Sequence, residues 1–180
     1  MGVVSRQLLK LAIVVVRCTA KALKLLGLRP ASLAEIEPAD DDWYLNLLWF
    51  DRRKCLLVAH AGTGFSVFVP DVRKVDLDPI GPFLVRAITA ALDDETLPRD
   101  VLGVLDPADV RIAKTASRRV LGIMNDDAYH LDYMLDRYGS VLDVDVITVN
   151  RRLQRTLHTH GRDYRHPIDL VRERMAKPAS

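Results

Sequence analysis

The chain has 180 residues, of which 49% are hydrophobic and 28% are charged, and its formal net charge is +2. These values are ordinary for a globular protein, and they exclude an intrinsically disordered or collagen-like chain. A chain of this length is close to the usual size of one domain, so we expect a single hydrophobic core.

The charged residues are unevenly distributed along the chain. Residues 1–30 hold six basic and no acidic residues, and residues 151–180 hold eight basic and three acidic residues. By contrast, residues 71–110 hold four basic and nine acidic residues. Two basic ends can attract an anion such as a nucleic-acid backbone or a membrane surface. The alternative is that they only offset the acidic middle of the chain.

The cysteines and the first apolar run indicate where in the cell the protein is expected. Cys18 and Cys55 form neither a Cys-x-x-Cys pair nor a disulfide framework, which favours a reducing compartment. The apolar run at residues 11–16 is far too short to span a membrane. We therefore expect a cytoplasmic protein without a membrane-spanning helix.

Residues 5–26 allow two interpretations. As one helix capped by Ser5, the segment gathers its basic residues on one side, which suits a membrane surface or a partner's groove. The β-branched run Ile13–Val16 instead favours a strand, followed by a short helix between Thr19 and Gly27. We prefer the strand followed by the helix.

Three short strand candidates follow, at Trp43–Phe50, Lys54–His60 and Phe65–Val69. The breaks between them contain turn residues at hairpin spacing, so they predict an antiparallel meander. A helix is expected at residues 79–92, because a proline opens it and its apolar residues recur at helical spacing.

The second half of the chain is mainly helical in pattern. Val110–Lys114 is expected to be a strand, and the strongest helical pattern covers Ser117–Tyr138, ending at Gly139. Residues 141–149 fit a strand and a helix equally well, so their structure stays open. A last helix is expected at Pro167–Met175.

These elements predict one α+β domain with a mostly antiparallel sheet. The sheet is built from residues 43–69, and the helices at 79–92 and 117–138 pack on it. Amphipathic helices must bury their apolar sides, and the sheet offers the surface for this.

One flank of the helix at 117–138 suits a ligand best. Gly122 lies there, and a glycine costs about 1 kcal/mol relative to alanine inside a helix, so a ligand or another backbone approaching closely is one reason for it. The alternative is that Gly122 packs closely on the sheet while its polar neighbours bond to loop carbonyls. The predicted binding residues are Lys54, Thr115, Arg118, Asn125 and Tyr129.

Other groups give weaker signals. Asp126 and His130 are four residues apart but point away from the apolar stripe, which indicates an exposed pair. Residues 158–166 contain three histidines and an aspartate without metal-site spacing, so we expect no metal and no cofactor. The three cations at residues 52–54 suit either a phosphate or a solvated turn.

Several short segments together form a family pattern. They are Arg17-Cys18-Thr19, Arg53-Lys54-Cys55-Leu56-Leu57, Lys114-Thr115, Arg118, Val120-Leu121-Gly122-Ile123-Met124-Asn125-Asp126, Asn150-Arg151-Arg152-Leu153, and Tyr164 three residues before Pro167. This pattern resembles an uncharacterised bacterial and archaeal domain family.

The resemblance covers about residues 13–176 and implies a strand, a short helix and then the meander. It makes residues 1–12 an extension and residues 177–180 a tail. The chain differs from the family pattern at Ser117, Arg119 and Ile123, where Asn, Ser and Ser are usual. The resemblance implies no substrate.

The expected function is a non-enzymatic binding module for a protein or a nucleic acid, because no set of acid, base and nucleophile is complete. Its basic ends are the expected contact. The alternative is a small hydrolase or transferase acting on an anionic or phosphorylated substrate. In that case Arg118 holds the anion, Asn125 orients it, Thr115 or Tyr129 adds a donor, and Lys54 reaches in. The catalytic residues and the oligomeric state stay open.

Overall fold

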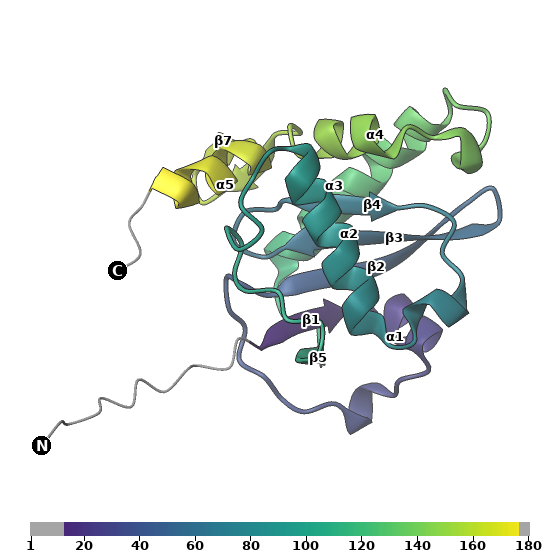
Figure 1. Ribbon diagram of the computed structural model, residues 1–180, viewed down its shortest axis with the longest axis vertical. Coiled ribbons are helices and arrows are strands. Elements are labelled where there is room, and N and C mark those ends of the chain that lie inside the picture. The colour runs from purple at the N-terminus through teal and green to yellow at the C-terminus, as the bar shows by residue number, and fades with distance from the viewer. Residues whose placement is uncertain (1–12, 177–180) are drawn as a thin grey trace, which may run out of the picture.

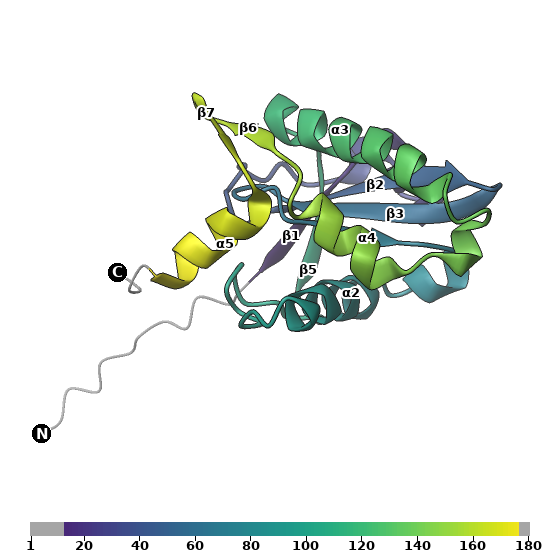
Figure 2. The same cartoon turned by 90° about the horizontal axis from the view of Figure 1, so that it is seen from above.

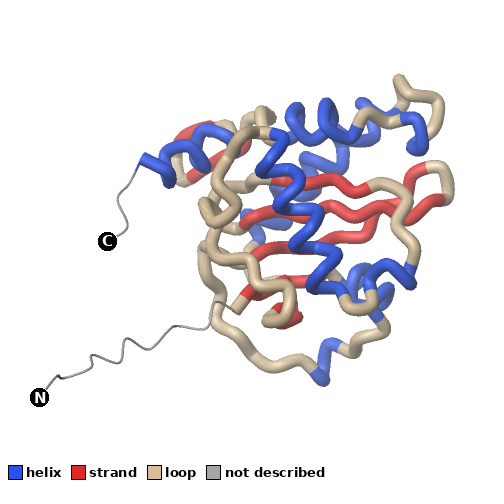
Figure 3. The backbone as a smooth tube through the Cα atoms, in the orientation of Figure 1, coloured by secondary structure: helices blue, strands red, loops and turns tan. Residues whose placement is uncertain are grey.

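Helices cover both faces of one five-stranded sheet in the computed structural model, which describes residues 13–176 (Figures 1 and 3). The strands are β1 (Val14–Cys18), β2 (Trp43–Phe50), β3 (Arg53–His60), β4 (Ser66–Val69), β5 (Val110–Lys114), β6 (His158–His160) and β7 (Asp163–Arg165). The α-helices are α1 (Ala20–Leu26), α2 (Ile80–Asp94), α3 (Arg118–Leu135), α4 (Val146–Leu153) and α5 (Pro167–Ala176). The architecture is that of a single α+β domain.

The sheet has the strand order β4-β3-β2-β1-β5 and is mixed. The meander is confirmed, since β3 is antiparallel to β2 and to β4. The expectation of a mostly antiparallel sheet is wrong for the other half, because β1 is parallel to both β2 and β5. Parallel neighbours need a crossover connection, and α1 with the segment after it provides the one between β1 and β2.

The first described elements confirm the preferred interpretation of a strand followed by a helix. The Thr19 hydroxyl accepts a hydrogen bond from the Ala22 amide at the start of α1, and Gly27 ends the helix with a φ of 71°. That left-handed conformation suits glycine, which has no Cβ. Residues 5–12 of the alternative single helix lie outside the described residues.

The predicted helices at 79–92, 117–138 and 167–175 correspond to α2, α3 and α5. The ambiguous segment at 141–149 is a short 3₁₀ turn followed by α4. The small hairpin formed by β6 and β7 was not predicted, because each of its strands has only three residues.

Two apolar clusters lie on opposite faces of the sheet. One joins α1, α2 and α5 to the sheet, and the other joins α3 and α4 to it. Figure 2 shows α2 and α3 as separate layers with the strands between them. Each helix therefore buries its apolar side as expected from its pattern.

Helix α4 closes the outer edge of β4. The Asn150 carboxamide accepts a hydrogen bond from the Phe68 amide at 2.7 Å and donates one to the Phe68 carbonyl at 3.4 Å. The Gln154 side chain donates to the Ser66 carbonyl at 3.1 Å. Two buried side-chain amides thus satisfy backbone groups that an exposed edge strand would leave open.

We expect Asn150→Ala to lower the free energy of unfolding by about 2 kcal/mol, because it leaves the buried Phe68 amide without a partner. Urea denaturation followed by circular dichroism measures this change. Arg152→Ala on the exposed side of α4 is the control and should change stability by less than about 0.5 kcal/mol. Equal stability of the two variants would contradict the proposed edge closure.

Candidate anion-binding site

Three of the residues predicted from the sequence share one exposed side of α3. Arg118, Asn125 and Tyr129 follow one another at helical spacing, and the Tyr129 side chain is 76% exposed. Gly122 lies among them, and a Cβ added there would meet no atom within 4 Å. The alternative that Gly122 packs closely on the sheet is therefore wrong.

The other two predicted binding residues, Lys54 and Thr115, lie outside this group and in different parts of the structure. Thr115 precedes α3 and lines a cavity of about 300 Å³ together with Arg17 and Lys114. The Lys54 ammonium lies 5.2 Å from the centre of the Trp49 ring, close to the turn between β2 and β3.

The two ends of α3 separate Lys54 from Arg118. Trp49 borders a cavity with Asp132 and Asp136, so the carboxyl end of α3 lies near Lys54. Arg118 begins the helix, whose 18 residues span about 27 Å. The structure thus places Arg118, Asn125 and Tyr129 along one side of α3, spread over about 16 Å, with Thr115 near Arg118 and Lys54 near the opposite end.

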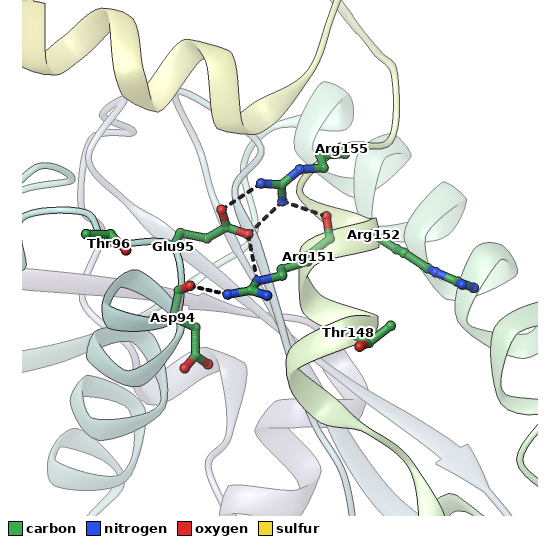
Figure 4. A pocket seen from close by; sticks show the side chains of 7 residues that line it. All are labelled: Asp94, Glu95, Thr96, Thr148, Arg151, Arg152 and Arg155. Atoms are coloured by element: carbon green, nitrogen blue, oxygen red, sulfur yellow. Dashed lines mark hydrogen bonds and ion pairs between the residues drawn. The ribbon is translucent and has the colours of Figure 1, made fainter.

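A different group of charged side chains surrounds a cleft where the end of α2 faces α4 (Figure 4). The cleft has a volume of about 670 Å³, which lies in the range of pockets that bind small molecules. It is lined by Asp94, Glu95, Thr96, Thr148, Arg151, Arg152 and Arg155.

The fold of α4 places these arginines at the cleft. Asp145 caps the helix, accepting hydrogen bonds from the Thr148 amide at 3.3 Å and from the Thr148 hydroxyl at 2.6 Å. Val149 and Leu153 are buried and fix the rotation of the helix about its axis. Arg151 and Arg152 lie in its last turn, where positive side chains are favoured by the helix dipole.

Glu95 holds two of the arginines in place. Its side chain is only 4% exposed, and its two oxygens accept hydrogen bonds from Arg155 at 2.6 and 2.7 Å. The Arg151 guanidinium lies 3.8 Å from the same carboxylate and donates to the Asp94 carbonyl at 2.7 Å. The bond to Glu95 raises the pKa of Arg155, so this guanidinium stays charged.

Arg152 differs from its two neighbours. Within residues 13–176 its side chain forms no hydrogen bond or ion pair, and Figure 4 shows it pointing away from Glu95. All five of its N–H donors are therefore open to solvent or to a ligand. The cleft thus combines two guanidiniums of fixed orientation with a third that has no partner there.

Sequence reasoning found part of this cleft. It identified the basic character of residues 151–180 and the segment Asn150-Arg151-Arg152-Leu153, which belongs to the family pattern. It did not find Glu95, which lies 56 positions before Arg151 and meets it only because α2 and α4 pack together. No local spacing signals such a pair.

A family model described as DUF6933, a domain of unknown function, matches residues 15–170. The chain belongs to this family. The match confirms the resemblance and spans both α2 and α4, so the whole arginine cleft lies inside the family domain. No curated protein matches the chain.

None of the helices within residues 13–176 is long and apolar enough to cross a membrane. In the β6–β7 region His158 Nε2 lies 3.1 Å from an Asp127 carboxylate oxygen, and His166 Nδ1 lies 2.7 Å from the Arg155 carbonyl.

Proposed function

We propose that the protein is a non-enzymatic binding module that engages a nucleic acid through its phosphate groups at the arginine cleft. The observation that supports this proposal is that three arginines of one chain segment line one cleft, two of them held by Glu95 and the third without a partner within the described residues. We also propose a cytoplasmic location, which the free and buried thiols of Cys18 and Cys55 support.

Phosphate suits this cleft because guanidinium groups present planar sets of donors that match its oxygens. Glu95 keeps Arg151 and Arg155 oriented, so less side-chain entropy is lost when a ligand binds. No aromatic side chain lines the cleft among the described residues. The proposed contact is therefore to the backbone and independent of base sequence.

The alternative proposal is a small hydrolase or transferase acting on an anionic or phosphorylated substrate. Such an enzyme needs a base or nucleophile beside the arginines. The Glu95 carboxylate is engaged by two guanidiniums, and the Thr148 hydroxyl donates to Asp145. These two groups are already occupied, which leaves Asp94 and Thr96 as the remaining lining residues with a carboxylate or a hydroxyl. The cleft therefore offers three guanidiniums but few groups for chemistry, which favours binding.

The test is a titration of a short labelled duplex at low and at physiological ionic strength. Contacts by three arginines should give a slope of about −3 in a plot of log K against log salt concentration. Arg152→Gln should weaken binding roughly tenfold at low salt and reduce the slope by about one. Duplexes of different sequence should bind alike.

Arg52→Gln is the matched control, since Arg52 is also exposed and its side chain has no partner within the described residues. We expect this variant to bind like the unmodified protein. An unmodified protein that does not bind the duplex at low salt would refute the proposal. If Arg152→Gln and Arg52→Gln lost the same affinity for the duplex, the duplex would bind elsewhere on the surface, which would also refute the proposal.

A further inference from the structure

The outer side of α3 has an unusual composition for an exposed helix surface. Tyr129 and Tyr133 are 76% and 62% exposed, and they share this side with Arg118 and Asn125. No described element packs over this side, although the β6–β7 hairpin lies beside α3 in Figure 2 and Asp132 and Asp136 border a cavity with Trp49. Tyrosine and arginine are the side chains most enriched where proteins bind one another.

Gly122 marks the middle of this surface. Glycine is unfavourable inside a helix, and here no atom lies within 4 Å of the position that a Cβ would take. The packing of the domain on itself therefore gives no reason for the glycine. The helix surface between Arg118 and Asn125 is therefore open at Gly122, and a side chain from outside can approach the backbone there.

The charges on the same side are divided along the helix. Arg118 is at the amino end, and Asp132 and Asp136 are near the carboxyl end, all three of them exposed. Their side chains form no hydrogen bond or ion pair within residues 13–176. Arg137 adds a positive charge beside these two carboxylates, since its guanidinium lies 4.9 Å from the centre of the Tyr133 ring. The carboxyl end of this side therefore carries two negative charges and one positive charge. A helix side with opposite net charges at its two ends complements a second copy of itself that runs in the opposite direction.

We propose that α3 packs antiparallel against α3 of a second copy of this chain, with Tyr129 lying on the open backbone at the partner subunit's Gly122. In this register each residue faces the partner residue whose number, added to its own, gives 251, as Gly122 and Tyr129 do. Arg118 then faces the partner's Tyr133 beside the partner's Asp132, and Asn125 faces the partner's Asp126. Every contact occurs twice, because the two-fold axis relates the copies.

The expected dimer is weak. One helix of 18 residues limits the contact to a length of about 27 Å, which corresponds to the small class of interfaces. The dissociation constant should therefore be on the order of 10 μM, in line with transient complexes. This inference does not depend on the arginine cleft, which lies on α4.

Sedimentation equilibrium over a range of protein concentrations measures the affinity of the dimer. Variants in which the charges of facing residues are reversed test the proposed contact. Arg118→Glu or Asp132→Arg alone places like charges together and should weaken the dimer about tenfold or more. The double variant restores opposite charges and should return the affinity to within about threefold of the unmodified protein. An unmodified protein that is monomeric at all concentrations overturns the proposal, and so does a double variant that stays as weak as the single ones.

Gly122→Met provides an independent test that does not risk the fold. Methionine is a better helix former than glycine and has open space at this position, so the monomer should be at least as stable. The longer side chain occupies the space meant for Tyr129 and should weaken the dimer about tenfold. A dimer of unchanged affinity in this variant would contradict the proposed contact.

Discussion

Replacing Asp127 by alanine should lower the free energy of unfolding by about 3–5 kcal/mol, because Asp127 holds a buried polar cluster together. Its side chain is fully buried, accepts a hydrogen bond from the Ser66 hydroxyl at 2.5 Å, and lies 3.1 Å from His158 Nε2. The substitution leaves His158 Nε2 buried without its partner and leaves the Ser66 hydroxyl with the Gly64 carbonyl alone, and it opens a cavity beneath α3.

The cluster also joins distant parts of the chain. It links β4, α3 and the start of β6, so its loss should loosen the β6–β7 hairpin from the domain. Urea denaturation measures the stability, with Asp132→Ala as the control because that side chain of α3 is exposed and lies outside the cluster. A loss of less than about 1 kcal/mol in Asp127→Ala would show that the cluster does not carry this energy.

The second large expected effect is that the protonation of His60 makes the free energy of unfolding depend on pH. Burial lowers the pKa of His60 from 6.5 to about 3, and the nearby positive charge of Arg174 acts in the same direction. Between these two values the unfolded chain binds a proton that the folded chain does not. The contribution of His60 is therefore complete above pH 6.5 and is lost as the pH falls towards 3, by about 1.4 kcal/mol per pH unit.

The surroundings of His60 suit the neutral imidazole. Its Nδ1 lies 3.0 Å from the Thr63 hydroxyl, its ring packs in a T-shaped arrangement with Trp43, and its buried Nε2 has no hydrogen-bond partner within the described residues. His60→Gln removes the titrating group, so its stability should fall less steeply over the same pH interval. Denaturation at a series of pH values compares this variant with His130→Gln, an exposed histidine of α3. Parallel curves for the His60 variant and the unmodified protein would contradict the account.

Local patterns predicted the elements that fold by local rules. The β2–β3–β4 meander is signalled by turn residues between apolar runs, and α3 by its apolar stripe and cap. The direction of β1 was not predictable in this way. Whether a strand pairs parallel or antiparallel with its neighbour depends on the path of the crossover, which residues 27–42 do not encode in a motif.

The segment at 141–149 shows why periodicity alone fails for short elements. It alternates like a strand, yet it forms α4 because Asp145 caps the helix and Asn150 bonds to the edge of β4. The second of these causes is a contact across 82 positions of sequence. Tertiary packing therefore decides between two local patterns that are equally good.

The candidate sites were predictable to different degrees. Arg118, Asn125 and Tyr129 were correctly expected to share one side of a helix, because a helical wheel determines this. The arginine cleft depends on Glu95, and on the contact between α2 and α4, which a helical wheel does not contain. Lys54 was grouped with Arg118 although the length of α3 separates them.

Nuclear magnetic resonance with a short duplex tests whether the arginine cleft contacts phosphate groups. We expect the side-chain N–H signals of Arg151 and Arg152 and the backbone amides of α4 to shift as the duplex is added. They should return as salt is raised, because the contacts are ionic. Shifts confined to α1 or α3, with α4 unchanged, would contradict the account.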